Sequence, residues 1–441
     1  MSTASVKRVV IAAESTYASI SSSTGLPVRP SGVGVAFERA SVDVQGGASE
    51  LVERGVPTRG AFAQPPEVST MFSGGVRQRR QTGDVTIRMR VHGYGAGAVG
   101  GTPADIMATP LALILRTVMG SAAPGSALPA IAAGPFANAG LVEFDSPPGL
   151  TAGEVVLALV DGCVVANRVT GVTGNVATFL HYWPRQLITG DKLVRGAQFF
   201  VGVDGTLGTH GPSVYVGLYT LDTITDCYGC RMSSITFAPE GGQLFADVTL
   251  RAAIIQPDID TAGTVVLPAP APIYLAPTCT LRGSALLRTN GDTGPLAGAS
   301  APLSIASSEM PYQLDGWSLA MTFELVPIGT GCGLAGEQGV EVGSWSVTYG
   351  YTRHITRTDD EDDLLNAVSR GLAIAAGPIT SGTNDHNGWG CSLPAACLTA
   401  DPNVSAPDGS LLQQALAYRA ADYAGDTGLS RTVALFLGGE P

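Results

Sequence analysis

The sequence is poor in charged and aromatic side chains. Only 14% of its 441 residues are Asp, Glu, Lys or Arg, and 6% are aromatic. With so little charge, the surface must consist largely of Gly, Ser, Thr, Ala and Asn. This composition favours a chain that buries much of its surface against copies of itself over a free-standing enzyme. A net charge of −12 also argues against a general nucleic-acid-binding surface.

Long apolar runs and clustered cysteines are also lacking. No stretch approaches the 18 or more apolar residues of a membrane helix, and the opening MSTASVKRVVIAAESTY has no apolar core of the length that a secretion signal needs. We therefore expect a chain that stays in the cytoplasm and contacts no membrane. The cysteines are scattered and odd in number, which predicts reduced thiols: Cys163, Cys227, Cys230, Cys279, Cys332, Cys391 and Cys397.

The dominant positive signal is the two-residue period of β-strands. VTIRMRVH (85–92) and WSLAMTFELV (317–326) alternate apolar and polar residues without a break, and 57 Gly and 29 Pro supply turns. The pattern predicts a mainly β protein of packed antiparallel sheets, a β-sandwich or partial barrel, with a few flanking helices. Further strands are predicted at 5–13, 34–45, 154–169, 176–182, 213–220, 232–238, 243–254, 344–356 and 429–437.

Three helices are predicted from their end signals. The clearest has Thr109 as N-cap, Pro110 at the first helical position and Gly120 as C-terminal stop. The others would be capped by Thr358 and Ser410. The three predicted helices span 110–120, 358–371 and 409–424.

The length allows two or three domains. Residues 46–83 are predicted to be a long functional loop, 120–150 a linker and 376–409 an extended arm. A weak echo between GDVTIRMRVHGYG and GSWSVTYGYTRHIT leaves open a duplicated β-plus-helix unit. The predicted parts are a first β domain (1–125), a linker with a small β insert (126–200), hairpins with a second β-plus-helix unit (201–375) and a C-terminal arm, helix and strand (376–441).

No catalytic, metal-binding or cofactor-binding residue is assigned, and we expect a protein that is not an enzyme. Cys227 and Cys230 form a C-x-x-C, but four-ligand zinc would need a second pair, and a redox motif would need a helix where a strand is predicted. GCGLAG (331–336) is followed by a turn and a strand, and DDEDD (359–363) lacks calcium-loop spacing. We interpret all three as structural motifs that bind no metal or cofactor.

One block resembles a known family. It runs from LTAGEVVLALVDGCVVANRVTGVTGNVATFLHYWPRQLITGDKLVRGAQFFVG into GPSVYVGLYTLDTITDCYGCRMSSITFAPEGGQLFADVTLRAAI, residues 150–254, and the opening VVIAAESTYAS is similar too. The block resembles the tail tube proteins of long-tailed bacteriophages. The resemblance implies packed sheets with a flanking helix, and copies that form rings stacked into a tube through which genome DNA passes without specific binding. The partners it implies are further copies, the tape-measure protein and other tail proteins. The location it implies is the virion tail, assembled in the host cytoplasm.

Several residues take expected roles from this resemblance. If the strands at 243–254 and 317–326 line the tube, Asp247 and Glu324 face its lumen. The loop 46–83 would reach between rings. A single fold implies rings of six, and a duplicated fold implies rings of three. A further expectation comes from the residues themselves: the basic cluster Arg77, Arg79, Arg80, Arg88 and Arg90 could bind phosphate, but no aromatic residues interleave it and the chain is acidic, so we expect it to contact an acidic face of a neighbouring subunit.

Two other classes stay open at this point. A capsid or decoration protein would share the Gly-rich β composition but would bind a shell. A glycan-binding or hydrolytic β-protein would be expected to show a secretion signal, and clustered aromatics with paired carboxylates on one face.

Overall fold

The protein is mainly β, as the alternating pattern predicts. The structure is a computed structural model in which 66% of residues are in strands and 6% are helical, with one large antiparallel sheet. The arrangement of packed sheets as a sandwich or partial barrel stays a prediction. The residues that the structure describes are 8–15, 17–19, 29–30, 35–37, 41–54, 76–91, 94–95, 103–123, 125–134, 139–161, 163–202, 212–219, 223–259, 286–289, 308–309, 316–328, 339–354, 360–377, 385–386, 388–400, 403–405, 413–421 and 431–440.

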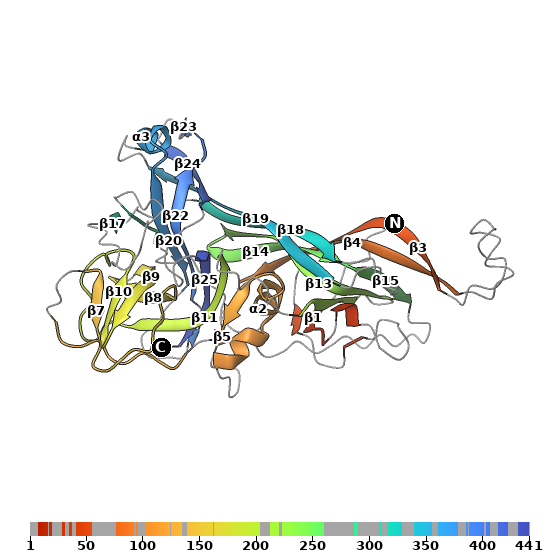
Figure 1. The fold of residues 1–441 in the computed structure, drawn as a ribbon, viewed down its shortest axis with the longest axis horizontal. Coiled ribbons are helices and arrows are strands. Elements are labelled where there is room, and N and C mark those ends of the chain that lie inside the picture. The colour runs from red at the N-terminus through yellow and green to blue at the C-terminus, as the bar shows by residue number, and fades with distance from the viewer. Residues whose placement is uncertain are drawn as a thin grey trace.

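The longest strands form one continuous run of antiparallel neighbours (Figure 1). Both strands singled out from the sequence, at 85–92 and 317–326, belong to it. In spatial order the run is β3 (Ser41–Arg54), β4 (Val76–Arg90), β14 (Gln243–Ala252), β13 (Thr223–Glu240), β18 (Gly316–Ile328), β19 (Gly339–His354) and β24 (Gln413–Ala420).

Beyond β24 the sheet branches at β22 (Trp389–Leu398). The C-terminal part of β22 pairs with β24 and its N-terminal part pairs with β25, while β20 pairs along its other edge. The strands of this region are β6 (Gly120–Ala122), β11 (Leu193–Gly202), β16 (Leu286–Thr289), β17 (Ser308–Glu309), β20 (Ser369–Ala376), β23 (Asn403–Ser405) and β25 (Arg431–Glu440).

Smaller groups of strands continue from this framework. One extends from β11 and lies at the lower left of Figure 1: β7 (Leu141–Glu143), β8 (Val155–Val160), β9 (Cys163–Thr173) and β10 (Val176–Phe179). Another uses the N-terminal half of β13: β1 (Arg8–Ala13), β2 (Val35–Phe37), β12 (Val214–Tyr219) and β15 (Ile254–Ile259). A separate two-stranded pair is β5 (Tyr94–Gly95) with β21 (Asp385–His386).

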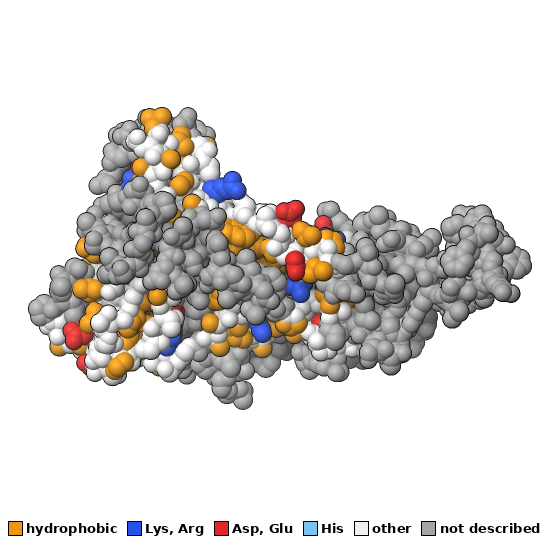
Figure 2. Space-filling model, viewed as in Figure 1, with side chains coloured by type: hydrophobic (Ala, Val, Ile, Leu, Met, Phe, Trp, Pro, Cys, Tyr) orange, Lys and Arg blue, Asp and Glu red, His pale blue; other side chains and the backbone are white. Residues whose placement is uncertain are grey.

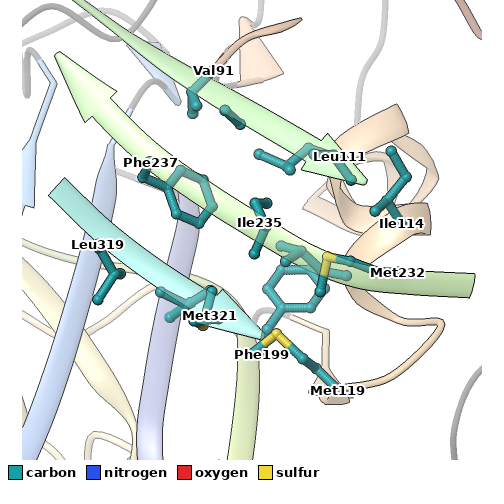
Figure 3. Packing of buried hydrophobic residues seen from close by; sticks show 14 of the residues in the cluster. Val91, Leu111, Ile114, Met119, Phe199, Met232, Ile235, Phe237, Leu319 and Met321 are labelled. Carbon is teal, nitrogen blue, oxygen red and sulfur yellow. The ribbon is translucent and has the colours of Figure 1, made fainter. Parts of the chain in front are cut away.

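The main core lies on the apolar face of the long run. Figure 3 shows Ile235 and Phe237 of β13 and Met321 of β18 packed together, with Leu111 and Phe199 beside them. Trp389 of β22 packs against Phe237 at 5.1 Å and against Trp317 at 5.4 Å between ring centroids. Residues distant in sequence therefore meet in one core, which holds the run against β11, β22 and β25. A second core lies under β7–β10 and includes Val142, Phe144, Leu157, Val165 and Trp183.

The helices are shorter than predicted. Thr109 does cap α2 (Pro110–Leu115), because its hydroxyl accepts the N–H of Ala112, but the helix ends before Gly120, which begins β6. The helix predicted at 358–371 is reduced to α3 (Asp360–Leu365), and Gly371 lies inside β20. Two 3-10 turns complete the helical segments of the described chain: η1 (Tyr17–Ser19) and η3 (Pro103–Ala108).

The third predicted helix, at 409–424, is wrong. Residues 413–420 form β24, in which Gln414, Leu416, Tyr418 and Ala420 are buried and the alternate residues are exposed. Ala, Leu and Gln favour helices intrinsically, but pairing with β19 on one side and β22 and β23 on the other outweighs that preference.

Three segments predicted as irregular contain strands. The loop predicted at 46–83 is wrong at both ends, because β3 runs to Arg54 and β4 starts at Val76; residues 55–75 lie outside the described chain. The linker 120–150 holds β6 and β7. The arm 376–409 holds β22, a fully paired strand next to the main core. Gly and Pro in these segments mark turns between short strands and do not indicate that the whole segment is irregular.

Candidate assembly surface

Alternation gives the long run of strands a second face, which is polar and open. Residues opposite one another in an antiparallel register share a face of the sheet, so this face can be followed from strand to strand. One row across it reads Arg88, Asp247, Thr236, Ala320, Thr348 and Arg419. We call this the polar face. Its half-buried or exposed residues include Thr86, Arg90, Phe245, Thr249, Ser234, Ser318, Thr322, Glu324, Ser344, Ser346, Ala415 and Ala417.

Small uncharged side chains dominate the polar face. On the described part of the surface in Figure 2, charged side chains are scattered among white and orange atoms and form no large patch of one sign. The low proportion of charged residues in the sequence predicts such a surface. Burying a face of Ser, Thr, Ala and Gly under another chain costs less than burying a charged face, and such a face holds no strong field.

Both residues predicted to face a lumen lie on the polar face. Asp247 is 3.6 Å from the Arg88 guanidinium, which also pairs with Glu240. Glu324 accepts a hydrogen bond of 2.7 Å from the Ser344 hydroxyl. The charge of Asp247 is therefore partly balanced within the chain. That either residue faces a lumen stays a prediction.

The structure adds an aromatic ring to the arginine cluster. Phe245, in the strand next to β4, has the Arg88 guanidinium 4.9 Å and the Arg90 guanidinium 5.9 Å from its ring centre. No local sequence pattern indicates this contact, because Phe245 is separated from β4 by more than 150 residues. Of the other cluster members, Arg77 lies opposite Glu53 and Arg80 opposite Glu50 in the strand register, and Arg79 opposite Leu51. The side chains of these three arginines lie outside what the structure describes.

The outer part of β3 and β4 forms a two-stranded ribbon, residues 49–54 and 76–81. It projects to the right of the molecule in Figure 1. The pairing of β4 with β14 ends at Gly83, and β3 pairs only with β4 among the described strands. Both edges of the ribbon therefore carry backbone N–H and C=O groups without a strand partner in the described chain. An isolated two-stranded hairpin is at best marginally stable in water.

The DCYGCR stretch forms a corner in β13. Residues up to Tyr228 pair with β15, and residues from Arg231 onward pair with β14. Between them Gly229 has φ +67°, and the register with β12 shifts there. The Gly229 N–H donates to the Glu14 carboxylate at 3.1 Å, and the Ser213 hydroxyl also donates to Glu14. Nothing in the sequence pattern pointed to Glu14, since its partners lie about 200 residues away.

The two cysteines of this stretch are buried. Cys227 and Cys230 are fully inaccessible, and burial raises the pKa of both thiols. Reactive and metal-binding cysteines need accessible thiolates. In the parts of the chain that the structure describes, no group of three or more His, Cys, Asp or Glu side chains is placed to hold a metal ion.

Buried charges are held by ion pairs and hydrogen bonds. Arg195 bonds Glu154 through its Nε at 2.7 Å, and both side chains are at least nine-tenths buried. Arg29 bonds Asp226 at 2.7 Å, and this hydrogen bond raises the pKa of Arg29. His181 differs, because neither ring nitrogen has a hydrogen-bond partner within the described chain; burial lowers the pKa of His181 to about 3. The two ion pairs hold the buried Glu154 and Asp226 carboxylates in the fold.

Within the residues described, no helix is both long and apolar enough to span a membrane. A comparison of the sequence with protein-family models found no matching family, and a comparison with curated proteins found no significant match. Functional inference therefore rests on the polar face, the ribbon and the resemblance of the 150–254 block.

Proposed function

We propose that the protein is a structural subunit that self-assembles into stacked rings, which form the tail tube of a long-tailed bacteriophage. The observation that carries the proposal is the open ribbon of β3 and β4. In a monomer, a projecting pair of strands whose edges are both unpaired in the described chain would be marginally stable and prone to aggregation. Natural proteins usually cover such edges or make them unsuitable for pairing. A neighbouring copy would cover them.

The polar face supports the same function. In a ring, the polar faces of successive copies would join into one inner surface around the passing DNA. A lining of small uncharged side chains, with Arg88 balanced by Glu240 and Asp247, would neither hold nor block a phosphate backbone. The expected partners are further copies, a tape-measure protein inside the growing tube and other tail proteins. The expected location is the virion tail, after assembly in the host cytoplasm.

Electron microscopy of the purified chain tests the proposal. We expect negatively stained rings or stacked tubes about as wide as a phage tail. Persistent monomers at high concentration would refute it, and binding to preformed capsid shells or to glycans would instead favour one of the two other classes.

Two ribbon variants make the test specific. In the first, a short turn replaces residues 49–81, so that the ribbon is lost while the pairs from Ser41 to Gly46 remain. Because the variant keeps the pairing of Ser41–Gly46 with β4 and the pairing of β4 with β14, we expect it to fold and to lose assembly. In the matched control, a turn replaces only residues 55–75 and both ribbon strands are kept. Equal assembly of the two variants would show that the ribbon is not the contact.

A further inference from the structure

The polar face has two chemically different ends. In the register, β13 and β14 meet at their turn, Gly241–Gly242, so this turn marks one end of the face. β18 runs the opposite way along β13, and its last residues, from Glu324 to Ile328, extend with β19 beyond the pairing with β13. The two hairpins therefore point in opposite directions along the strands.

The first end, which we call the arginine end, consists of Arg88, Arg90, Glu240, Phe245 and Asp247. Arg88 is balanced by Glu240 and Asp247. Arg90 is exposed, lies over the Phe245 ring and has no ion pair within the described residues. This end thus presents one uncompensated guanidinium beside an aromatic ring. Arginine and aromatic side chains are the residue types that dominate binding energy in protein interfaces.

The second end, the glutamate end, consists of Glu324, Val326, Ile328, Glu341 and Ser344. Val326 and Ile328 are 43% and 40% exposed, which is unusual for apolar side chains of this chain. Glu341 lies opposite Val326 in the register and is exposed, and Glu324 has only a hydrogen bond from Ser344 in the described chain. This end therefore combines exposed apolar surface with two carboxylates, and the Arg251 guanidinium also reaches it, because its Nη1 donates to the Leu325 carbonyl at 3.1 Å.

We propose that the arginine end of one copy docks on the glutamate end of the next copy. In this contact Arg90 pairs with Glu324 or Glu341, and Phe245 with the arginine stems covers Val326 and Ile328. The contact joins two different patches, so it is heterologous: it cannot close into a symmetric dimer, and repeated along the strand direction it gives an open stack. This proposal rests on the proposed function only because it takes the partner to be a second copy of the chain. The contact would join successive rings.

Charge reversal distinguishes this contact from other modes of association. We expect Arg90→Glu and Glu324→Arg each to weaken end-to-end association by about tenfold or more, because each places two like charges together. A mixture of the two variants restores it, since Glu at 90 faces Arg at 324 in one junction and Arg90 faces Glu324 in the next. The double variant R90E/E324R also restores it. A contact between two identical arginine ends would be weakened by Arg90→Glu alone and would not recover in the double variant.

Sedimentation velocity and electron microscopy of the single variants, the mixture and the double variant provide the measurement. Arg419→Glu is the matched control, because Arg419 is exposed on the same face, in the row of Asp247 but four strands across the sheet from β14. It should associate like the unaltered chain. Circular dichroism checks that each variant is folded.

The outcomes separate this inference from the proposed function. Single rings that no longer stack in the Arg90→Glu variant, and that stack again in the mixture, support the contact. Single variants that associate like the unaltered chain, or a mixture that fails to recover, overturn it. If the unaltered chain forms no rings, the proposed function fails, and sedimentation of its end-to-end oligomers still decides the contact.

Discussion

Replacing Gly229 by Ala should destabilise the corner of β13. Gly229 has φ +67°, a conformation that costs a residue with a Cβ about 1–2 kcal/mol. A Cβ at this position would lie 2.8 Å from the Cβ of Ala253 and 3.2 Å from that of Ala18. Carbon atoms do not approach this closely without a shift of the backbone, and such overpacking costs about 1–3 kcal/mol. The two effects together predict a loss of about 2–5 kcal/mol in the free energy of unfolding.

Gly241→Ala is the matched control. Gly241 also has a positive φ, +58°, but a Cβ there would meet no atom within 4 Å. This variant should therefore show only the conformational cost of about 1–2 kcal/mol. The difference between the two variants isolates the packing at the corner.

Urea unfolding followed by tryptophan fluorescence measures the difference. With a slope of about 3 kcal/mol per M, a packing cost of about 1–3 kcal/mol puts the midpoint of Gly229→Ala about 0.3–1 M below that of Gly241→Ala. Trp317 and Trp389 lie in the main core and report its loss. Equal midpoints for the two variants would refute the close approach of Gly229 to Ala253.

Three further predictions concern buried groups. Burial lowers the pKa of His181 to about 3, whereas the imidazole in the unfolded chain has its ordinary pKa of about 6.5. The unfolded chain therefore binds the proton more strongly between these values. The free energy of unfolding should fall as the pH drops from 6.5 toward 3, by about 2 kcal/mol at pH 5. His181→Leu should make stability less dependent on pH between pH 6.5 and pH 3. An unchanged slope would contradict the assignment of this pH dependence to His181. Arg195→Met leaves the Glu154 carboxylate buried without its guanidinium partner and should lower the free energy of unfolding by about 3–5 kcal/mol. The E154Q/R195M double variant should lose less. Equal losses for the two variants in denaturant unfolding would argue against a stabilising ion pair. Cys227 and Cys230 should resist alkylation at pH 8 until the chain is unfolded, as mass spectrometry of labelled peptides can show, and labelling of the native protein would contradict their burial.

Strand faces were predictable from the sequence, because the pleat places alternate side chains on opposite faces whatever the neighbouring strand is. Val85 and Ile87, and likewise Trp317 and Leu319, are buried as their alternation predicts. The same local rule placed Asp247 on a polar face.

Where a local signal competed with a distant contact, prediction from the sequence failed. The end signal at Ser410 predicts a helix over 409–424, but pairing with β19 on one side and β22 on the other makes residues 413–420 a strand. The Gly and polar residues at the ends of the segment 46–83 predict a loop. In the structure the two ends pair with each other and form the ribbon. In both cases the deciding partner is outside the local window, so no local pattern could reveal it.

The sequence by itself determined that this is a mainly β chain with little charge, and which side chains of the clearest strands face the core. Only the tertiary structure decided that β4, β13, β14 and β18 are neighbours, that Phe245 lies beside Arg88, and that Gly229 turns a strand from one set of partners to another. The physical reason is the range of the interactions. Alternation acts between adjacent residues, whereas strand pairing and close approach depend on residues brought together from distant parts of the chain.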